Sequence, residues 1–226
     1  MDLGNHTFSH PSLQVTPLDE FQEDVVRGEI VTKRLLAEAG RKIRYFRHPF
    51  LRTGPSLKVR QDFENFLERK GYTVAPVTIE NWDWLYAMVY RDALEEQDAA
   101  TAKRVAAAYL EYTQSQIAFC ENAALTILGR QPRHVLLLHD NQLAADTLDD
   151  LAALIAKRGY TFVTLDRALE DPTYKSPDTY AGPAGASWLF RWDATGERKV
   201  DWKQEPEPQE WVRKMYEDRS RARQDR

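Results

Sequence analysis

Two histidines near the start of the chain have a spacing that suits metal binding. His6 and His10 lie four residues apart in the segment NHTFSHP at positions 5–11. Gly4 and Pro11 favour the end of a strand that turns into a loop, where two imidazoles can converge on one cation. Imidazole suits zinc, cobalt, nickel or iron. The alternative is that both are surface or hydrogen-bonded loop histidines, and the spacing alone does not decide between these interpretations.

A second group of residues follows the next predicted strand. Arg47, His48, Pro49 and Phe50 come directly after the predicted strand at 43–46. Sites gather at the C-terminal ends of strands in α/β sheets and barrels, and a guanidinium there can bind a carboxylate through two hydrogen bonds. The alternative for Arg47 is a surface arginine, and we interpret His48 as structural.

Two later segments complete the candidate site. Asp83 lies between Trp82 and Trp84, which suggests a sugar-facing groove whose indole faces stack on pyranose rings. The alternative is that one tryptophan belongs to the core and Asp83 caps a helix that starts near Leu85. His139 ends the apolar run at 135–138, and its imidazole suits acid–base chemistry near neutral pH.

Taken in chain order, these groups resemble the polysaccharide deacetylases with a NodB-homology domain, which include chitin, peptidoglycan and xylan deacetylases. The resemblance runs from about Leu3 to Leu169, and the H-[ST]-x-x-H-P element is matched in full. It implies that His6 and His10 bind a divalent metal, which is zinc or alternatively cobalt or nickel. Arg47 resembles the arginine that positions the catalytic base.

The resemblance also implies roles for the later residues. Asp83 resembles the carboxylate that orients the catalytic histidine, and His139 resembles that histidine, the general acid. The residues that would contact substrate are Trp82, Trp84, Leu137, Pro49 and Phe50. The implied reaction is metal-dependent hydrolysis of N- or O-acetyl groups, so the expected partner is an acetylated polysaccharide or oligosaccharide. Export to the periplasm or outside the cell is also expected from the resemblance.

One part of the family pattern has no counterpart here. The family begins with a strand that ends in a Thr-Phe-Asp-Asp-like motif, which supplies the catalytic base and the third metal ligand. No such segment precedes His6. We therefore expect Met1 to be an internal methionine of a longer protein, and this chain to be inactive or impaired alone. The alternative is a non-catalytic carbohydrate-binding or interaction protein on the same scaffold.

Alternation of strand and helix patterns predicts the elements that would carry these residues. Helices are expected at 18–39, 57–70 and 145–158, two more within 85–128, and strands at 43–46, 72–79, 135–138 and 161–164. The pattern favours an α/β fold, and the resemblance implies a distorted (β/α) barrel with its first strands missing. The predicted organisation is a partial domain at 1–170 with a helical insertion around 85–129, then a C-terminal extension at 171–226, loop-rich and then charged.

Composition excludes some classes of protein. The 226 residues are 42% hydrophobic and 29% charged, which is typical of a soluble globular protein. The net charge of −4 gives no sign of nucleic-acid binding, and no apolar run is long enough to be a transmembrane segment. The single cysteine, Cys120, cannot form an internal disulfide, and we interpret it as a buried helical thiol. The sequence does not indicate an oligomeric state.

Overall fold

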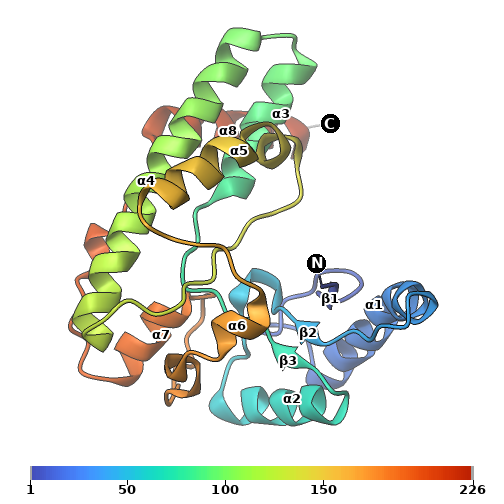
Figure 1. Ribbon diagram of the computed structural model, residues 1–226. Coiled ribbons are helices and arrows are strands. Elements are labelled where there is room, and N and C mark those ends of the chain that lie inside the picture. The colour runs from blue at the N-terminus through green and yellow to red at the C-terminus, as the bar shows by residue number, and fades with distance from the viewer. Residues whose placement is uncertain (1, 225–226) are drawn as a thin grey trace. The chain divides into compact units, whose positions relative to one another are not determined.

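The computed structural model describes residues 2–224 and shows that the predicted (β/α) barrel is wrong (Figure 1). Helices make up 58% of the chain and strands 4%, and the strands form one small parallel sheet of three. The predicted strand at 161–164 is not a strand. The predicted strand at 135–138 contributes only a bridge between Leu136 and Ile79. The described residues therefore hold too few paired strands to close a barrel.

The chain divides into two compact units, which are described separately. The first unit comprises the residues up to Val77 together with Thr164–Lys199. The second comprises Thr78–Val163 together with the residues from Val200 onward. The candidate residues from His6 to Phe50 belong to the first unit, and those from Trp82 to His139 belong to the second.

The first unit is built on the parallel sheet. Its strands are β1 (Gly4–Asn5), β2 (Tyr45–Phe46) and β3 (Thr73–Val74), in that order across the sheet. Helix α1 (Leu18–Glu38) connects β1 to β2, and α2 (Leu57–Arg69) connects β2 to β3. Both helices were predicted from the sequence, within one residue at each end.

The core of the first unit lies between these two helices and the sheet. Phe21 and Val25 of α1 are buried with Phe46 of β2 and with Phe63 and Leu67 of α2. Three rings in this core meet edge to face, with centroids 5.1 Å apart for Phe21 and Phe63 and 5.4 Å apart for Phe46 and Phe63. This packing joins α1 and β2 through α2.

The rest of the first unit consists of short helices that were not predicted. They are the 3₁₀ helices η1 (Pro49–Leu51) and η2 (Pro172–Lys175) and the α-helices α6 (Leu165–Leu169) and α7 (Trp188–Thr195). Helix α7 begins at an N-cap, Ser187, whose hydroxyl accepts the N–H of Phe190. Its Leu189 and Trp192 are buried, so α7 packs into this unit.

The second unit is helical. It contains α3 (Asp83–Glu95), α4 (Ala99–Leu128), α5 (Gln142–Lys157), the short η3 (Trp202–Gln204) and α8 (Glu210–Gln224). The two helices expected within 85–128 are confirmed as α3 and α4. Helix α5 is also confirmed, but it starts three residues earlier than predicted because Asn141 caps it, accepting the N–H of Ala144 at 2.8 Å.

Helix α3 packs against α4, α5 and α8 around an apolar core. Tyr86 of α3, Tyr109 of α4, Leu143 of α5 and Val212 of α8 are all buried in it. Cys120 of α4 is also buried, as expected from its apolar neighbours. Among residues 2–224, no helix is both long and apolar enough to cross a membrane.

Candidate functional site

The first unit brings His6 and His10 together. Their ring centroids lie 4.8 Å apart and the rings meet edge to face. Nδ1 of His6 is 2.7 Å from the backbone oxygen of Arg47, so the neutral ring donates from Nδ1 and keeps its lone pair on Nε2. A backbone carbonyl bonded to one ring nitrogen commonly orients a histidine that binds metal through the other. The donor chemistry of this pair therefore fits a divalent metal.

The fit to a metal is limited by the number of ligands. Within residues 2–224, no cluster of three or more His, Cys, Asp or Glu side chains is placed to hold a metal ion. A catalytic zinc usually has three protein ligands. His6 and His10 would therefore hold a metal with the remaining positions left to water or substrate, and we expect such a site to bind weakly.

The residues after β2 lie beside the histidine pair. The N–H of Arg47 donates to the backbone oxygen of Asn5 at 3.0 Å, which continues the pairing of β1 with β2. Its Nε is buried without a hydrogen-bond partner among the described residues, and burial lowers the pKa of this guanidinium. The exposed ring of Phe50 lies 4.4 Å from that of His10, edge to face, whereas Pro49 is buried. Phe50 thus forms a wall next to the histidine pair.

His48 is buried in the same unit and has a structural environment. Its ring contacts those of Phe46 and Phe63, at centroid distances of 5.2 and 5.4 Å. Burial, followed by the positive charges of Arg191 and Arg60, lowers the pKa of His48 to about 3. This ring is therefore neutral at physiological pH, in agreement with its interpretation as structural.

The second unit brings Asp83 and His139 together. Asp83 is the first residue of α3 and is 2% exposed. Its Oδ1 lies 2.7 Å from Nδ1 of His139, and its Oδ2 accepts the backbone N–H of His139 at 2.7 Å. Trp82, and not Asp83, occupies the N-cap position, with a left-handed φ of 49° and no side-chain cap. Asp83 therefore orients the histidine and is not a helix cap.

The two tryptophans beside Asp83 differ in environment. Their rings are stacked, with centroids 5.6 Å apart and an interplanar angle of 26°. Trp82 is 40% exposed, whereas Trp84 packs against the core of the second unit and meets Tyr216 edge to face. Leu137 is half-buried, and its N–H donates to the oxygen of Ile79 at 3.0 Å. Of these side chains, Trp82 is the most exposed.

Two acidic residues were not identified from the sequence: one lies near Asp83 and His139, and the other lies near the histidine pair. Burial raises the pKa of Glu80, and the charge of Glu205 raises it further, while the charge of His139 opposes this increase. In the first unit, Asp24 is buried on α1 between Phe21 and Val25. A carboxylate at an apolar helix position was the available signal for Asp24, because such a group needs a partner when buried.

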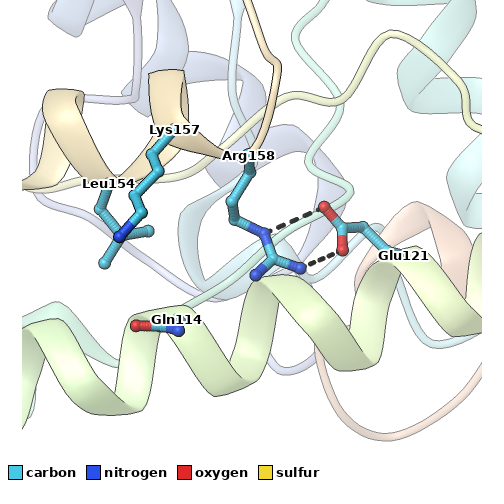
Figure 2. A pocket seen from close by; sticks show the side chains of 5 residues that line it. All are labelled: Gln114, Glu121, Leu154, Lys157 and Arg158. Atoms are coloured by element: carbon cyan, nitrogen blue, oxygen red, sulfur yellow. Dashed lines mark hydrogen bonds and ion pairs between the residues drawn. The ribbon is translucent and has the colours of Figure 1, made fainter.

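A surface pocket of about 430 Å³ lies elsewhere in the second unit, between α4 and α5 (Figure 2). It is lined by Gln114, Glu121, Leu154, Lys157 and Arg158. Arg158 binds both carboxylate oxygens of Glu121, and Tyr160 donates to the same carboxylate at 3.0 Å. None of the residues predicted from the sequence lines this pocket, and its main charged groups already neutralise each other.

Comparison with models of protein families, with curated proteins and with solved structures found no match to this chain.

Proposed function

We propose that this chain takes part in metal-dependent hydrolysis of acetyl groups on a polysaccharide or its oligomers. The contact between Asp83 and His139 is the observation that carries the proposal. These residues lie 56 positions apart in the sequence, and two hydrogen bonds join them. A buried carboxylate bound to Nδ1 leaves Nε2 as the ring nitrogen that can exchange a proton with a ligand. That arrangement suits a general acid.

The residues of each unit would contribute separate steps. His6 and His10 would hold a divalent metal, which supplies Lewis acidity at an acetyl carbonyl and at a water molecule when bound. In its protonated form, His139 would donate the Nε2 proton to the leaving amine or alcohol. Asp83 would stabilise the imidazolium and keep its ring in one orientation. Trp82 would stack on a sugar ring with its exposed indole face.

The test is acetate release from N-acetylated chito-oligosaccharides and acetylated xylo-oligosaccharides, with zinc or cobalt added. We expect slow, metal-dependent release that His139→Ala abolishes. His134→Ala is the matched control, because His134 is a histidine of the same unit that bonds Thr78 and Gln131 and has no assigned role. Release that is equal in wild type and His139→Ala, or release that is absent from wild type, would contradict the proposal.

A second function is favoured by one observation, the absence of a third metal ligand within residues 2–224. A non-catalytic carbohydrate-binding protein would need the exposed face of Trp82 but not a metal. Calorimetry with the same oligosaccharides separates the two functions. Binding without acetate release, lost in Trp82→Ala and kept in His139→Ala, supports the binding protein.

A further inference from the structure

A buried carboxylate on α1 holds the loop between the two histidines. Asp24 is 7% exposed, and its Oδ2 accepts the backbone N–H groups of Phe8 at 2.8 Å and Ser9 at 2.9 Å. Its Oδ1 accepts the hydroxyl of Ser9 at 2.8 Å. All three donors belong to the segment between His6 and His10, so one side chain fixes the course of this loop.

A glycine one turn further along α1 allows the loop to lie directly on the helix. A Cβ atom at Gly28 would lie 2.5 Å from the carbonyl carbon of Thr7 and 2.6 Å from its oxygen. Both distances are too short for any side chain, so the contact requires glycine. The neighbouring Arg27 places its guanidinium 4.2 Å from the ring centroid of Phe8. The loop is thus held by charge, by shape and by a cation–π contact.

The loop needs such contacts because its backbone is strained. Thr7 and His10 both have left-handed φ values, 69° and 57°. Residues other than glycine rarely adopt this conformation, because it brings the Cβ atom too close to the following carbonyl oxygen. Asn5 supports the same conformation, because its side-chain oxygen accepts the N–H of Thr7 at 2.8 Å while its amide donates to the oxygen of Val25. Surrounding contacts therefore hold a turn that the local sequence does not favour.

We infer that Asp24 and Gly28 are positioning residues that preset the His6 and His10 imidazoles for a divalent metal. The inference rests on the metal-binding role given to the histidines in the proposed function. Two ligands on a free loop lose conformational entropy when they bind one ion, whereas ligands on an anchored loop have already lost it. The bonds of Asp24 to this loop are to Phe8 and Ser9, so it acts on the course of the loop and not on either imidazole directly.

The experiment measures zinc affinity by calorimetry for the wild type, Asp24→Asn and Gly28→Ala. We expect both variants to bind zinc about 10-fold to 100-fold more weakly, the range typical of residues that orient metal ligands. Asp24→Asn removes a charge and Gly28→Ala adds a methyl group, so their only common effect is on the loop. Ser9→Ala, which removes one of the three donors from an exposed residue, should give a smaller loss.

Two controls separate positioning from general stability. Glu23→Gln makes the same charge change at an exposed position of α1 and should leave zinc affinity unchanged. Amide hydrogen exchange at Phe8 and Ser9 reports whether the loop has been released, and thermal unfolding reports whether each variant is folded. Faster exchange in Asp24→Asn with unchanged zinc affinity would overturn the positioning role.

The remaining outcomes distinguish this inference from the proposed function. Zinc binding that His6→Ala and His10→Ala do not weaken, or no zinc binding at all, overturns the inference and the metal site of the proposed function together. Zinc binding at the histidines that depends on Asp24 and Gly28, but without acetate release by the wild type, supports the inference and contradicts the proposed function alone.

Discussion

One carboxylate, that of Asp83, accepts both the backbone N–H and the ring Nδ1–H of His139, each at 2.7 Å. Two bonds to one residue fix both the position of the histidine backbone and the direction of its ring. The carboxylate is buried while the side chain of His139 is 44% exposed, so the acceptor lies inside and the imidazole reaches solvent. This asymmetry suits a group that must exchange protons.

The first prediction concerns the tautomer of His139. The neutral ring should carry its proton on Nδ1, because Asp83 can only accept a hydrogen bond there. Long-range ¹H–¹⁵N spectra of the imidazole distinguish the two tautomers. In Asp83→Asn, the side-chain amide can donate to Nδ1, so the population should shift toward Nε2–H. A wild-type ring protonated on Nε2 would contradict the assigned geometry.

The second prediction concerns the stability of the same pair. Asp83→Ala leaves the backbone N–H of His139 without its acceptor, which should lower the free energy of unfolding by about 1–3 kcal/mol. His139→Ala keeps that backbone bond and removes a partly exposed ring, so its cost should be smaller. Urea denaturation measures both. A larger loss in His139→Ala than in Asp83→Ala would show that the backbone bond is unimportant.

The third prediction is a pH dependence from His48. Its pKa is lowered from 6.5 to about 3 by burial and by the charges of Arg191 and Arg60. Between these two pH values the unfolded chain binds a proton that the folded chain does not. The free energy of unfolding therefore falls as pH falls below about 6.5, by up to about 1.4 kcal/mol per pH unit from this residue.

The variant His48→Phe tests whether His48 causes this pH dependence, because a phenyl ring suits the neighbouring aromatic rings and does not titrate. Denaturation between pH 4 and pH 7 should show a shallower slope in His48→Phe than in the wild type. His134→Gln is the control for loss of a more exposed histidine. Equal slopes in His48→Phe and the wild type would mean that other groups cause the acid sensitivity.

The fourth prediction concerns a buried carboxylate shared by two arginines. Asp178 binds Nε of Arg191 at 2.6 Å and a terminal nitrogen of Arg60 at 2.9 Å, and Arg191 is fully buried. Asp178→Ala should lower the free energy of unfolding by about 3–5 kcal/mol, because it leaves buried charge uncompensated. Asp62→Ala breaks an exposed pair with Lys58 and should cost less than about 1 kcal/mol. Similar losses in the two variants would contradict this view.

Helices α1 to α5 were predictable because their signals are local. An apolar stripe and a terminal glycine define α1 and α2 almost to the residue. The extent of the sheet was not predictable in the same way, because a strand requires partners that its own sequence does not specify. The segment 161–164 has β-branched and aromatic residues, yet Phe162 is 68% exposed and the segment is not a strand. The resemblance to a barrel family, together with strand propensity that found no pairing partner, led to the wrong fold class.

The candidate residues show the same division between local and distant information. The sequence identified Asp83, but both a cap and a histidine partner were consistent with a carboxylate at a helix start. Only the position of His139, 56 residues later, decides between them. Asp24 escaped notice because its three partners lie 15 or 16 residues earlier, in a loop whose strained backbone has no clear sequence signature.

The last prediction concerns the reactivity of Cys120. Burial raises the pKa of this thiol, and the nearby carboxylates of Glu205 and Glu121 raise it further. The thiolate is the reactive form, so the folded chain should react with a disulfide reagent such as DTNB far more slowly than the urea-unfolded chain. Glu205→Gln removes one neighbouring charge, and because burial is the larger cause, it should accelerate labelling only slightly. Rapid labelling of one thiol per folded chain at pH 8 would show that α4 opens readily at this position.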